Sequence, residues 1–177
     1  TSCNLADTIT KTIQIDENQT TELASVSICK NDSILLVAMP LDEFDYQWSP
    51  SSGLENFQSS STLASPSNTT EYVYVGQLDN CFDSIKQLVI VKEVELDYQT
   101  DAQLCGIPIT ITASVDDSTQ LFWSTHADFS TSIEQDSLVV STIGTYYLKA
   151  IRDGCQKTGA VDVSLTPDCC TEKNILI

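Results

Sequence analysis

The chain carries EYVYVGQLDNCFDSIKQLVIV at residues 71–91 and, 74 positions later and without a gap, TYYLKAIRDGCQKTGAVDVSL at residues 145–165. Each copy predicts a strand, a two-residue turn and a second strand. The turns fall at Asp79-Asn80 and Asp153-Gly154, residue types that tolerate the positive φ angles of tight hairpins. A hairpin that recurs at domain-sized spacing predicts tandem copies of one module.

The repeat also predicts the limits of the modules within the 177 residues. One full module is expected at 17–95 and a second at 96–167. Residues 1–16 resemble the C-terminal strand of a preceding repeat, or a linker. Residues 168–177 resemble the start of a following module. We therefore expect the chain to be an excised piece of a longer protein.

The charge of the chain is strongly negative. Asp and Glu number 25 against 8 Lys and Arg, which gives a net charge of −17. Nucleic acids and anionic membranes are bound chiefly through basic side chains, so neither is an expected partner. The sequence also lacks an apolar run of about 18 residues, so no membrane span is expected.

Many short strand patterns and the spacing of tryptophan between cysteines predict the fold class. Cys29 precedes Trp48 by 19 residues and Cys105 precedes Trp123 by 18; a further cysteine follows each tryptophan after 33 or 32 residues. No sustained 3.6-residue apolar period appears, so helix content should be low. We predict an all-β protein made of two tandem immunoglobulin-like β-sandwiches.

The seven cysteines predict disulfides formed in an oxidising, extracellular compartment. The leading pairs are Cys29–Cys81 and Cys105–Cys155, because pairing within each repeat gives nearly the same loop size twice. A bridge between neighbouring modules is the alternative. The second cysteine of each pair lies just past the hairpin turn, so a bridge would fasten one pole of a module. Cys3, Cys169 and Cys170 have no assigned partner.

The sequence offers little for catalysis. His126 is the only histidine, and nothing marks a partner for it in a catalytic triad. There is no Gly-rich phosphate loop and no H-E-x-x-H metal motif. We predict that the chain is not an enzyme and needs no cofactor.

Calcium is the one metal that the sequence suggests. Acidic side chains gather in two equivalent loops of the repeats, and hard oxygen ligands on a loop suit Ca²⁺. Such an ion could stiffen a string of extracellular modules, although solvated acids are the alternative. The candidate ligands are Asp42, Glu43, Asp45, Asp116 and Asp117.

Four short motifs carry a resemblance to a known family: Tyr46-Gln47-Trp48-Ser49-Pro50, Gly53-Leu54, Ala64-Ser65-Pro66 and Thr69-Thr70-Glu71-Tyr72. They resemble the immunoglobulin-like and PKD-like repeats of large Bacteroidota cell-surface proteins. The resemblance implies a stalk of a gliding-motility adhesin or similar surface protein exported by type IX secretion. Residues 168–177 are similar to the lead-in of a secretion-sorting domain, and a third repeat would explain the same residues.

The same resemblance implies O-glycosylation. Bacteroidota modify Ser or Thr after Asp and before a small or aliphatic residue, although such a motif can also mark a turn that enters a strand. The matching positions are Thr8, Ser33, Ser84, Ser118 and Ser137.

Three hypotheses of function follow. The first is a non-enzymatic stalk whose partners are neighbouring modules of the same chain and the type IX secretion machinery. The second is a module that recognises a polysaccharide or a partner protein, for which exposed aromatic residues such as Phe57 and Phe129 would be needed. The third is a self-polymerising filament subunit in which residues 1–16 and 168–177 complete other copies of the chain.

Overall fold

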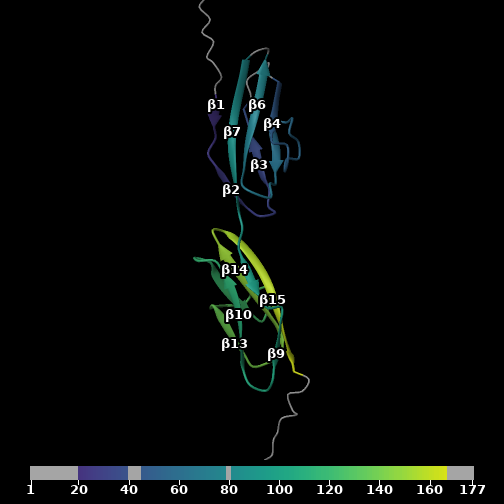
Figure 1. Ribbon diagram of the computed structural model, residues 1–177, viewed down its shortest axis with the longest axis vertical. Helices are drawn as coiled ribbons and strands as arrows, with labels where there is room; N and C mark the ends of the chain where they lie inside the picture. Colours follow the sequence, from purple (N-terminus) through teal and green to yellow (C-terminus); the bar gives the residue numbers. More distant parts are fainter. Residues whose placement is uncertain (1–19, 40–44, 79–80, 167–177) are drawn as a thin grey trace, which may run out of the picture. The chain divides into compact units, whose positions relative to one another are not determined.

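The computed structural model describes residues 20–39, 45–78 and 81–166, and it divides into two compact units, Thr1–Val91 and Lys92–Ile177. All regular structure in the described ranges is β-strand (Figure 1). The all-β prediction is confirmed. A search of the described residues finds no helix with the length and apolar character to cross a membrane.

The first unit is built from two sheets. The larger sheet has the order β1-β7-β6-β4, with β2 also paired to β7, and the smaller sheet pairs β3 with β5. The strands are β1 (Thr20–Glu22), β2 (Val26–Cys29), β3 (Ile34–Val37), β4 (Asp45–Ser49), β5 (Ser61–Ala64), β6 (Thr70–Leu78) and β7 (Cys81–Lys92).

The second unit repeats this plan with sheets of three and five strands. Their orders are β13-β10-β8 and β12-β11-β14-β15-β9. The strands are β8 (Leu96–Tyr98), β9 (Asp101–Leu104), β10 (Ile109–Val115), β11 (Gln120–Ser124), β12 (Ile133–Glu134), β13 (Ser137–Val140), β14 (Gly144–Arg152) and β15 (Cys155–Leu165).

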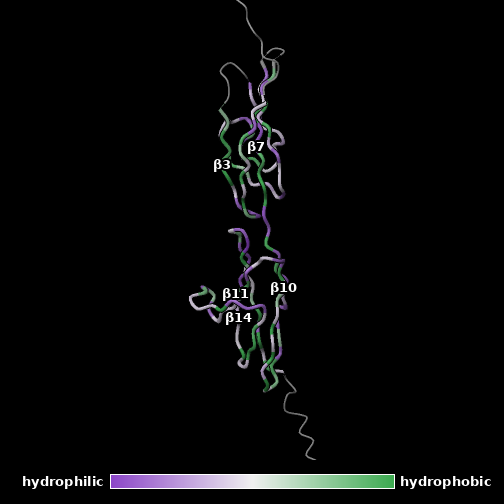
Figure 2. Tube along the Cα trace, turned by 90° about the vertical axis from the view of Figure 1, so that its left-hand side faces the viewer, coloured by the Kyte–Doolittle hydropathy of each residue, from purple (hydrophilic) through white to green (hydrophobic). Residues whose placement is uncertain are grey.

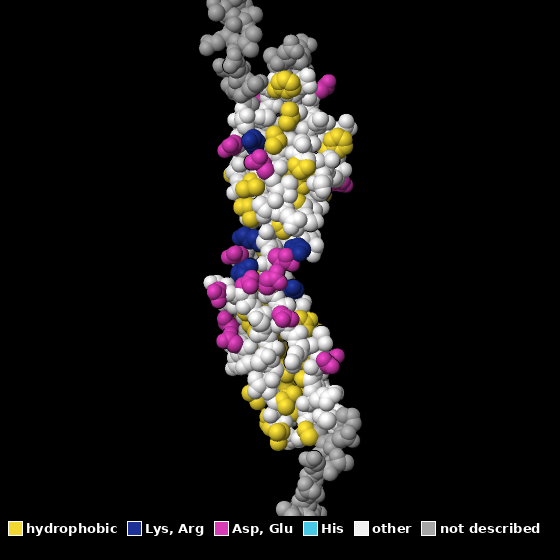
Figure 3. All heavy atoms as spheres, viewed as in Figure 1, with side chains coloured by type: hydrophobic (Ala, Val, Ile, Leu, Met, Phe, Trp, Pro, Cys, Tyr) yellow, Lys and Arg dark blue, Asp and Glu magenta, His cyan; other side chains and the backbone are white. Residues whose placement is uncertain are grey.

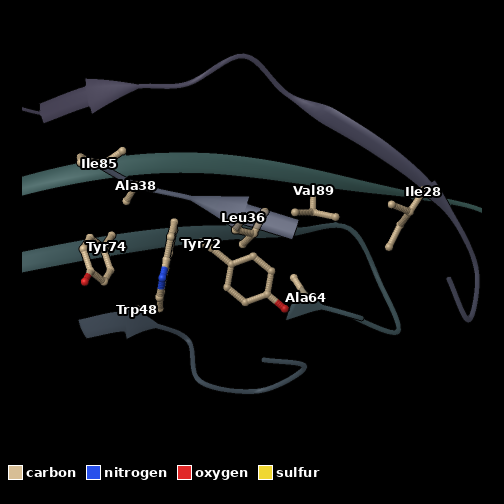
Figure 4. Packing of buried hydrophobic residues seen from close by; sticks show 9 residues of the cluster. All are labelled: Ile28, Leu36, Ala38, Trp48, Ala64, Tyr72, Tyr74, Ile85 and Val89. Carbon is tan, nitrogen blue, oxygen red and sulfur yellow. The ribbon is translucent and has the colours of Figure 1, made fainter. Parts of the chain in front are cut away.

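Each core lies between its two sheets, because alternate residues of a strand point to opposite faces. In the first unit, Leu36 and Ala64 from the small sheet meet Trp48 and Tyr72 from the large one (Figure 4). Trp48 is 2% exposed, and its equivalent in the second unit, Trp123, is 1% exposed. The two tryptophans fill the same place in two sandwiches, as the spacing between cysteines predicted.

One strand next to this core is apolar on both faces. β3 appears as a continuous hydrophobic stretch (Figure 2), yet only its alternate residues can enter the core. Leu36 is buried, whereas Leu35 and Val37 are 57% and 49% exposed. The outer face of the small sheet is therefore unusually apolar.

Strand order and strand direction identify the class of both units. In each, an early strand pairs in parallel with the last strand, β1 with β7 and β9 with β15, and all other registered pairs are antiparallel. The buried tryptophan lies on the strand next to the central hairpin. These are features of the immunoglobulin-like sandwich, so the predicted fold class is confirmed.

The predicted hairpins lie at the centre of both large sheets. β14 and β15 pair over nine positions, and the turn between them has positive φ at Asp153 (51°) and Gly154 (82°). Two successive positive φ angles are what a tight hairpin turn of the I′ type requires. The equivalent residues Asp79 and Asn80 lie outside the described residues.

Candidate functional site at the poles of the modules

The two described cysteines of the second unit lie at opposite ends of its last strand. Cys155 is the first residue of β15, whereas Cys105 follows Leu104, which pairs with Leu165 at the other end of that strand. Ten residues of strand separate these ends, or about 33 Å. A disulfide needs Cα atoms within about 7 Å. Cys105 and Cys155 are both disulfide-bonded, but this register rules out a bond between them.

The first unit has the same arrangement. Thr20, Thr21 and Glu22 run parallel to Ser84, Ile85 and Lys86, the Leu23 backbone N–H donates to the Lys86 carbonyl, and β2 also pairs with β7. Cys81, at the start of β7, lies about 17 Å before Lys86, whereas Cys29 lies beyond Glu22 on the other side. The predicted pair Cys29–Cys81 is therefore wrong as well. Cys29 is disulfide-bonded to another residue.

The wrong disulfide prediction has a physical cause. Equal loop sizes indicate that two repeats share one spacing, but not that the ends of each loop meet. An early strand parallel to the last strand carries its C-terminal cysteine away from the hairpin turn, where the second cysteine lies. The sequence does contain a signal for the position of Cys155. This residue comes directly after a hairpin turn, and such a turn marks a pole of the sandwich. The predicted position at a pole is correct for this cysteine.

On the face that Figure 3 shows, charged side chains gather near the pole of the second unit where the chain enters it. Arg152 donates from Nη1 to Asp116 Oδ2 at 2.7 Å and from Nη2 to the Glu93 carbonyl at 2.9 Å. Lys92 Nζ lies 3.9 Å from Asp153 Oδ2. Arg152 thus holds the entering backbone against the β14–β15 hairpin. The ion pairs are partly exposed, so each contributes at most about 1 kcal/mol.

The predicted calcium ligands are not brought together. Asp116 is paired with Arg152, Asp117 is exposed beside it, and Asp45 is exposed in the other unit. Asp42 and Glu43 lie outside the described residues. Within the described part of the chain, no group of three or more potential metal ligands is found. Calcium binding remains a prediction without a described ligand set.

His126 lies in an exposed loop after β11. Its Nδ1 is 3.2 Å from the hydroxyls of Thr125 and Thr131. In the same loop, the backbone N–H of Ser130 donates to Asp128 at 3.0 Å, and this bond lowers the pKa of the Asp128 carboxyl. These contacts close a polar loop on itself, which is a structural role.

The two aromatic residues considered for ligand binding differ in their surroundings. Phe57 is 40% exposed, and its carbonyl accepts a hydrogen bond from the Trp48 backbone N–H at 2.7 Å. The ring of Phe129 lies under the Lys149 ammonium group, 4.5 Å from the ring centroid. A cation–π contact of this kind occupies one face of the ring. Of these two residues, Phe57 is the one for which no such cation is found in the described part of the chain.

An apolar groove opens on the surface of the second unit, beside β12 and β13. Its lining includes Trp123, Ile133, Leu138, Val139 and Tyr146, and its volume is about 250 Å³. Ile133 and Val139 are 45% and 66% exposed. Ligand pockets usually measure about 300–1,000 Å³. The groove is therefore too small to enclose an oligosaccharide, although it could take one apolar side chain.

The predicted glycosylation positions differ in access. Ser33 is exposed directly before β3, and Ser118 is exposed in a turn with a positive φ of 66°. Ser84 and Ser137 are half-buried within strands, and the Ser84 Oγ lies 3.0 Å from the Thr20 Oγ1. Thr8 lies outside the described residues. Ser33 and Ser118 are thus the positions with the best access for a modifying enzyme.

The fold and these poles define a class, tandem immunoglobulin-like modules. No protein-family model and no curated protein matches the chain. Solved structures with a similar fold include the four N-terminal Ig domains of Dscam1 isoform 1.9, with 11% identity, a TM-score of 0.36, and coverage of 83% of this chain and 44% of that one. The three-Ig titin fragment I67–I69 has 14% identity, a TM-score of 0.42, and coverage of 80% and 62%.

This chain therefore spans less than two thirds of either fragment, and the likeness concerns the fold alone. A fold of this kind hosts many functions, so any particular role has to come from the sites.

Proposed function

We propose that the two modules are a non-enzymatic stalk segment of a secreted bacterial cell-surface protein, an adhesin or surface filament exported by type IX secretion. The observation that carries this proposal is the position of the disulfide-bonded cysteines. They lie at the poles of the modules instead of crossing the core. A disulfide bond at a pole fastens the module to the chain segment beside that pole. A stalk must resist bending and extension at such positions.

The entry to the second unit supports the same role. Three residues, 93–95, connect β7 to β8, and the carbonyl of Glu93 is held by Arg152. A short connection held by a side chain of the second unit suits a stalk segment. An extracellular location agrees with disulfides and with the acidic surface, because disulfides persist in oxidising compartments. Glycans on Ser33 and Ser118 would further protect such a surface.

Replacement of the modules tests the stalk role. In the native host, residues 20–166 of the full-length protein are exchanged for an unrelated pair of tandem immunoglobulin-like modules of the same length. We expect adhesion and surface display to persist, because a spacer contributes length and not chemistry. Loss of adhesion with intact surface display would contradict the proposal and would assign recognition to these modules.

Recognition of a partner protein is the alternative with a specific observation behind it. Leu35 and Leu63 lie opposite each other on the outer face of the small sheet, and they are 57% and 43% exposed. Apolar residues gathered on a surface favour an interface with another protein. Self-polymerisation depends on residues 1–16 and 168–177, which the structure does not describe. Sedimentation of the isolated chain at rising concentration tests whether the partner is another copy of this chain.

A further inference from the structure

In the first unit, a short segment of the loop between β4 and β5 covers the outer edge of β5. On its other edge, β5 pairs with β3. On the outer edge, the Glu55 backbone N–H donates to the Leu63 carbonyl at 3.0 Å, and the Ser65 N–H donates to the Gly53 carbonyl at 2.7 Å. Residues 53–55 therefore act as a short added strand.

The side chain that this added strand brings to the core is Leu54. It lies opposite Ala64 in an antiparallel bridge and packs, half-buried, against the hydrophobic core. The Tyr72 hydroxyl, which lies beside Ala64 (Figure 4), donates to the Ser52 carbonyl at 2.9 Å and holds the residues directly before Leu54. Two backbone hydrogen bonds and one leucine thus close this edge of the first sandwich.

The equivalent edge of the second unit is open. β13 corresponds to β5, because Val140 pairs with Ile109 as Ala64 pairs with Ile34. Among the described strands, β13 pairs only with β10, and β12 pairs only with β11. The apolar groove of about 250 Å³ is lined by residues of both edge strands and by Trp123. It therefore lies where the first unit has its added strand.

The loop that could cover this edge takes another path. Phe129 corresponds to Leu54, because each follows the tryptophan of its unit by six residues. The Phe129 ring lies under the Lys149 ammonium group and does not line the groove. The Tyr146 hydroxyl donates to the nearby Thr142 carbonyl instead of holding this loop. Within the described residues, the second unit thus leaves unfilled the space that a leucine fills in the first.

We propose that the free edge of β13 and the groove beside it bind an extended peptide segment of another protein by β-strand addition. In this mode of recognition, main-chain hydrogen bonds to the sheet edge supply affinity, and a pocket for an alternate side chain supplies specificity. Residues 53–55 provide the geometry. The added strand runs antiparallel to β13, with one leucine-sized side chain in the groove opposite Val140. The Val139 carbonyl and the Ser141 N–H form the two backbone hydrogen bonds.

The charges around the groove indicate a basic partner. Residues 124–143 contain both edge strands and the loops beside them, and this stretch has no Lys or Arg. Its three acidic residues, Asp128, Glu134 and Asp136, are exposed. Complementary charges at an interface steer association and disfavour partners of like charge. We therefore expect Lys or Arg beside the side chain that enters the groove.

Titration of the nitrogen-15-labelled full chain with a peptide, followed by NMR, tests the site residue by residue. The probe is a peptide of residues 51–58 with the change Glu55→Lys, which keeps the leucine and adds a positive charge. We expect saturable shifts of the backbone amides of residues 137–141 and of the Trp123 indole N–H. If these signals do not shift at millimolar peptide, or if only signals of other surfaces shift, the proposal is overturned.

Altered peptides distinguish strand addition from unspecific apolar binding. Leu54→Ser in the probe should weaken binding by at least about tenfold, because the groove loses its apolar occupant. Methylation of the backbone nitrogen of residue 55 should abolish binding, since in the first unit this N–H bonds to β5. Methylation at Asn56 is the control, because its N–H donates to the Thr62 hydroxyl, and Leu138 stands at the corresponding position. Equal binding of all these peptides would contradict strand addition.

Variants of the chain test the groove itself. Ile133→Ser should weaken binding of the probe by about fivefold or more, because Ile133 forms a wall of the groove. Ile107→Ser is the matched control, since Ile107 is 68% exposed and does not line the groove. An equal loss of binding in both variants would exclude the groove as the binding site.

Spectra of the free chain decide whether a second copy takes this edge instead. Signals of residues 137–141 that shift as the chain is concentrated, without peptide, would assign the edge to another copy and overturn the proposal. Spectra that do not change with concentration support an outside partner. The proposal does not depend on the stalk role, because the exchange of modules measures adhesion and this titration measures binding of a peptide.

Discussion

Two buried tyrosines fasten loops to the sheets by their hydroxyl groups. Tyr146 lies near the start of β14 and donates to the Thr142 carbonyl at 3.0 Å, four residues upstream. Tyr72 occupies the same place in β6 and donates to the Ser52 carbonyl at 2.9 Å. The first contact is the tyrosine corner found in immunoglobulin-like domains. Tyrosine thus occupies equivalent positions in the two units and holds a different loop in each.

Removal of the Tyr146 hydroxyl should destabilise the second unit. We expect Tyr146→Phe to lower its free energy of unfolding by about 1 kcal/mol, because the Thr142 carbonyl loses a donor. Urea unfolding followed by Trp123 fluorescence, in a Trp48→Phe background, measures this. The control is Tyr147→Phe, since the Tyr147 hydroxyl has no hydrogen-bond partner among the described residues. An equal loss in both variants would refute the role of the corner.

Burial of Tyr72 and Tyr74 predicts a loss of stability in alkali. Burial raises the pKa of both hydroxyls above the ordinary value of 10.0. Above pH 10 the unfolded chain releases these protons before the folded chain does, so the folded state becomes less stable as pH rises. Below pH 10 the contribution is fully present. We expect the urea midpoint of the first unit to fall from pH 9 to pH 11, and to fall less in Tyr72→Phe, Tyr74→Phe. The same fall in both proteins would contradict this cause.

Within the first sheet, a glycine makes room for stacked aromatic rings. Gly76 in β6 lies opposite Tyr46 in β4, and the Tyr46 ring covers it. That ring stacks on Tyr74 with centroids 4.8 Å apart, and its hydroxyl donates to Asp83 at 2.7 Å. An aromatic ring over a cross-strand glycine compensates for the side chain that glycine lacks.

Gly76→Ala should therefore destabilise the first unit. A Cβ at this position would overlap the Tyr46 ring, which would have to leave both the stack and Asp83. We expect a loss of about 1–3 kcal/mol in the free energy of unfolding, the usual range for overpacking. In a Tyr46→Ala background the same change should be neutral or stabilising, since alanine is less costly than glycine in a strand. Urea unfolding of the four proteins measures this cycle. A similar loss in both backgrounds would exclude the ring as the cause.

On the scale of the whole molecule, metal binding and covalent linkage are two ways to stiffen tandem modules. The described acids do not form a calcium site, and Asp116 is already neutralised by Arg152. By contrast, three cysteines of the described part of the chain, Cys29, Cys105 and Cys155, are disulfide-bonded. We therefore expect disulfide bonds, and not a bound metal ion, to stiffen this chain.

Calcium should not change the stability of the protein. We expect the same melting temperature in millimolar calcium as in an excess of chelator, because the described acids form no site for the ion. A bound ion would stabilise the folded state by mass action and would raise the melting temperature. Differential scanning calorimetry makes the comparison, with reductant as the positive control that should lower the melting temperature. An increase of several degrees in calcium would contradict this prediction and would point to the loops that contain Asp42 and Glu43.

The sequence by itself determined the class of the fold and the placement of its repeating parts. A period of two within strands, a tryptophan at constant spacing and a hairpin copied after 74 residues depend on local chemistry, so they can be recognised in one dimension. Only the tertiary structure decided how the cysteines relate. Whether Cys105 lies near Cys155 depends on the direction in which β9 runs along β15, and a strand has the same pattern in either direction.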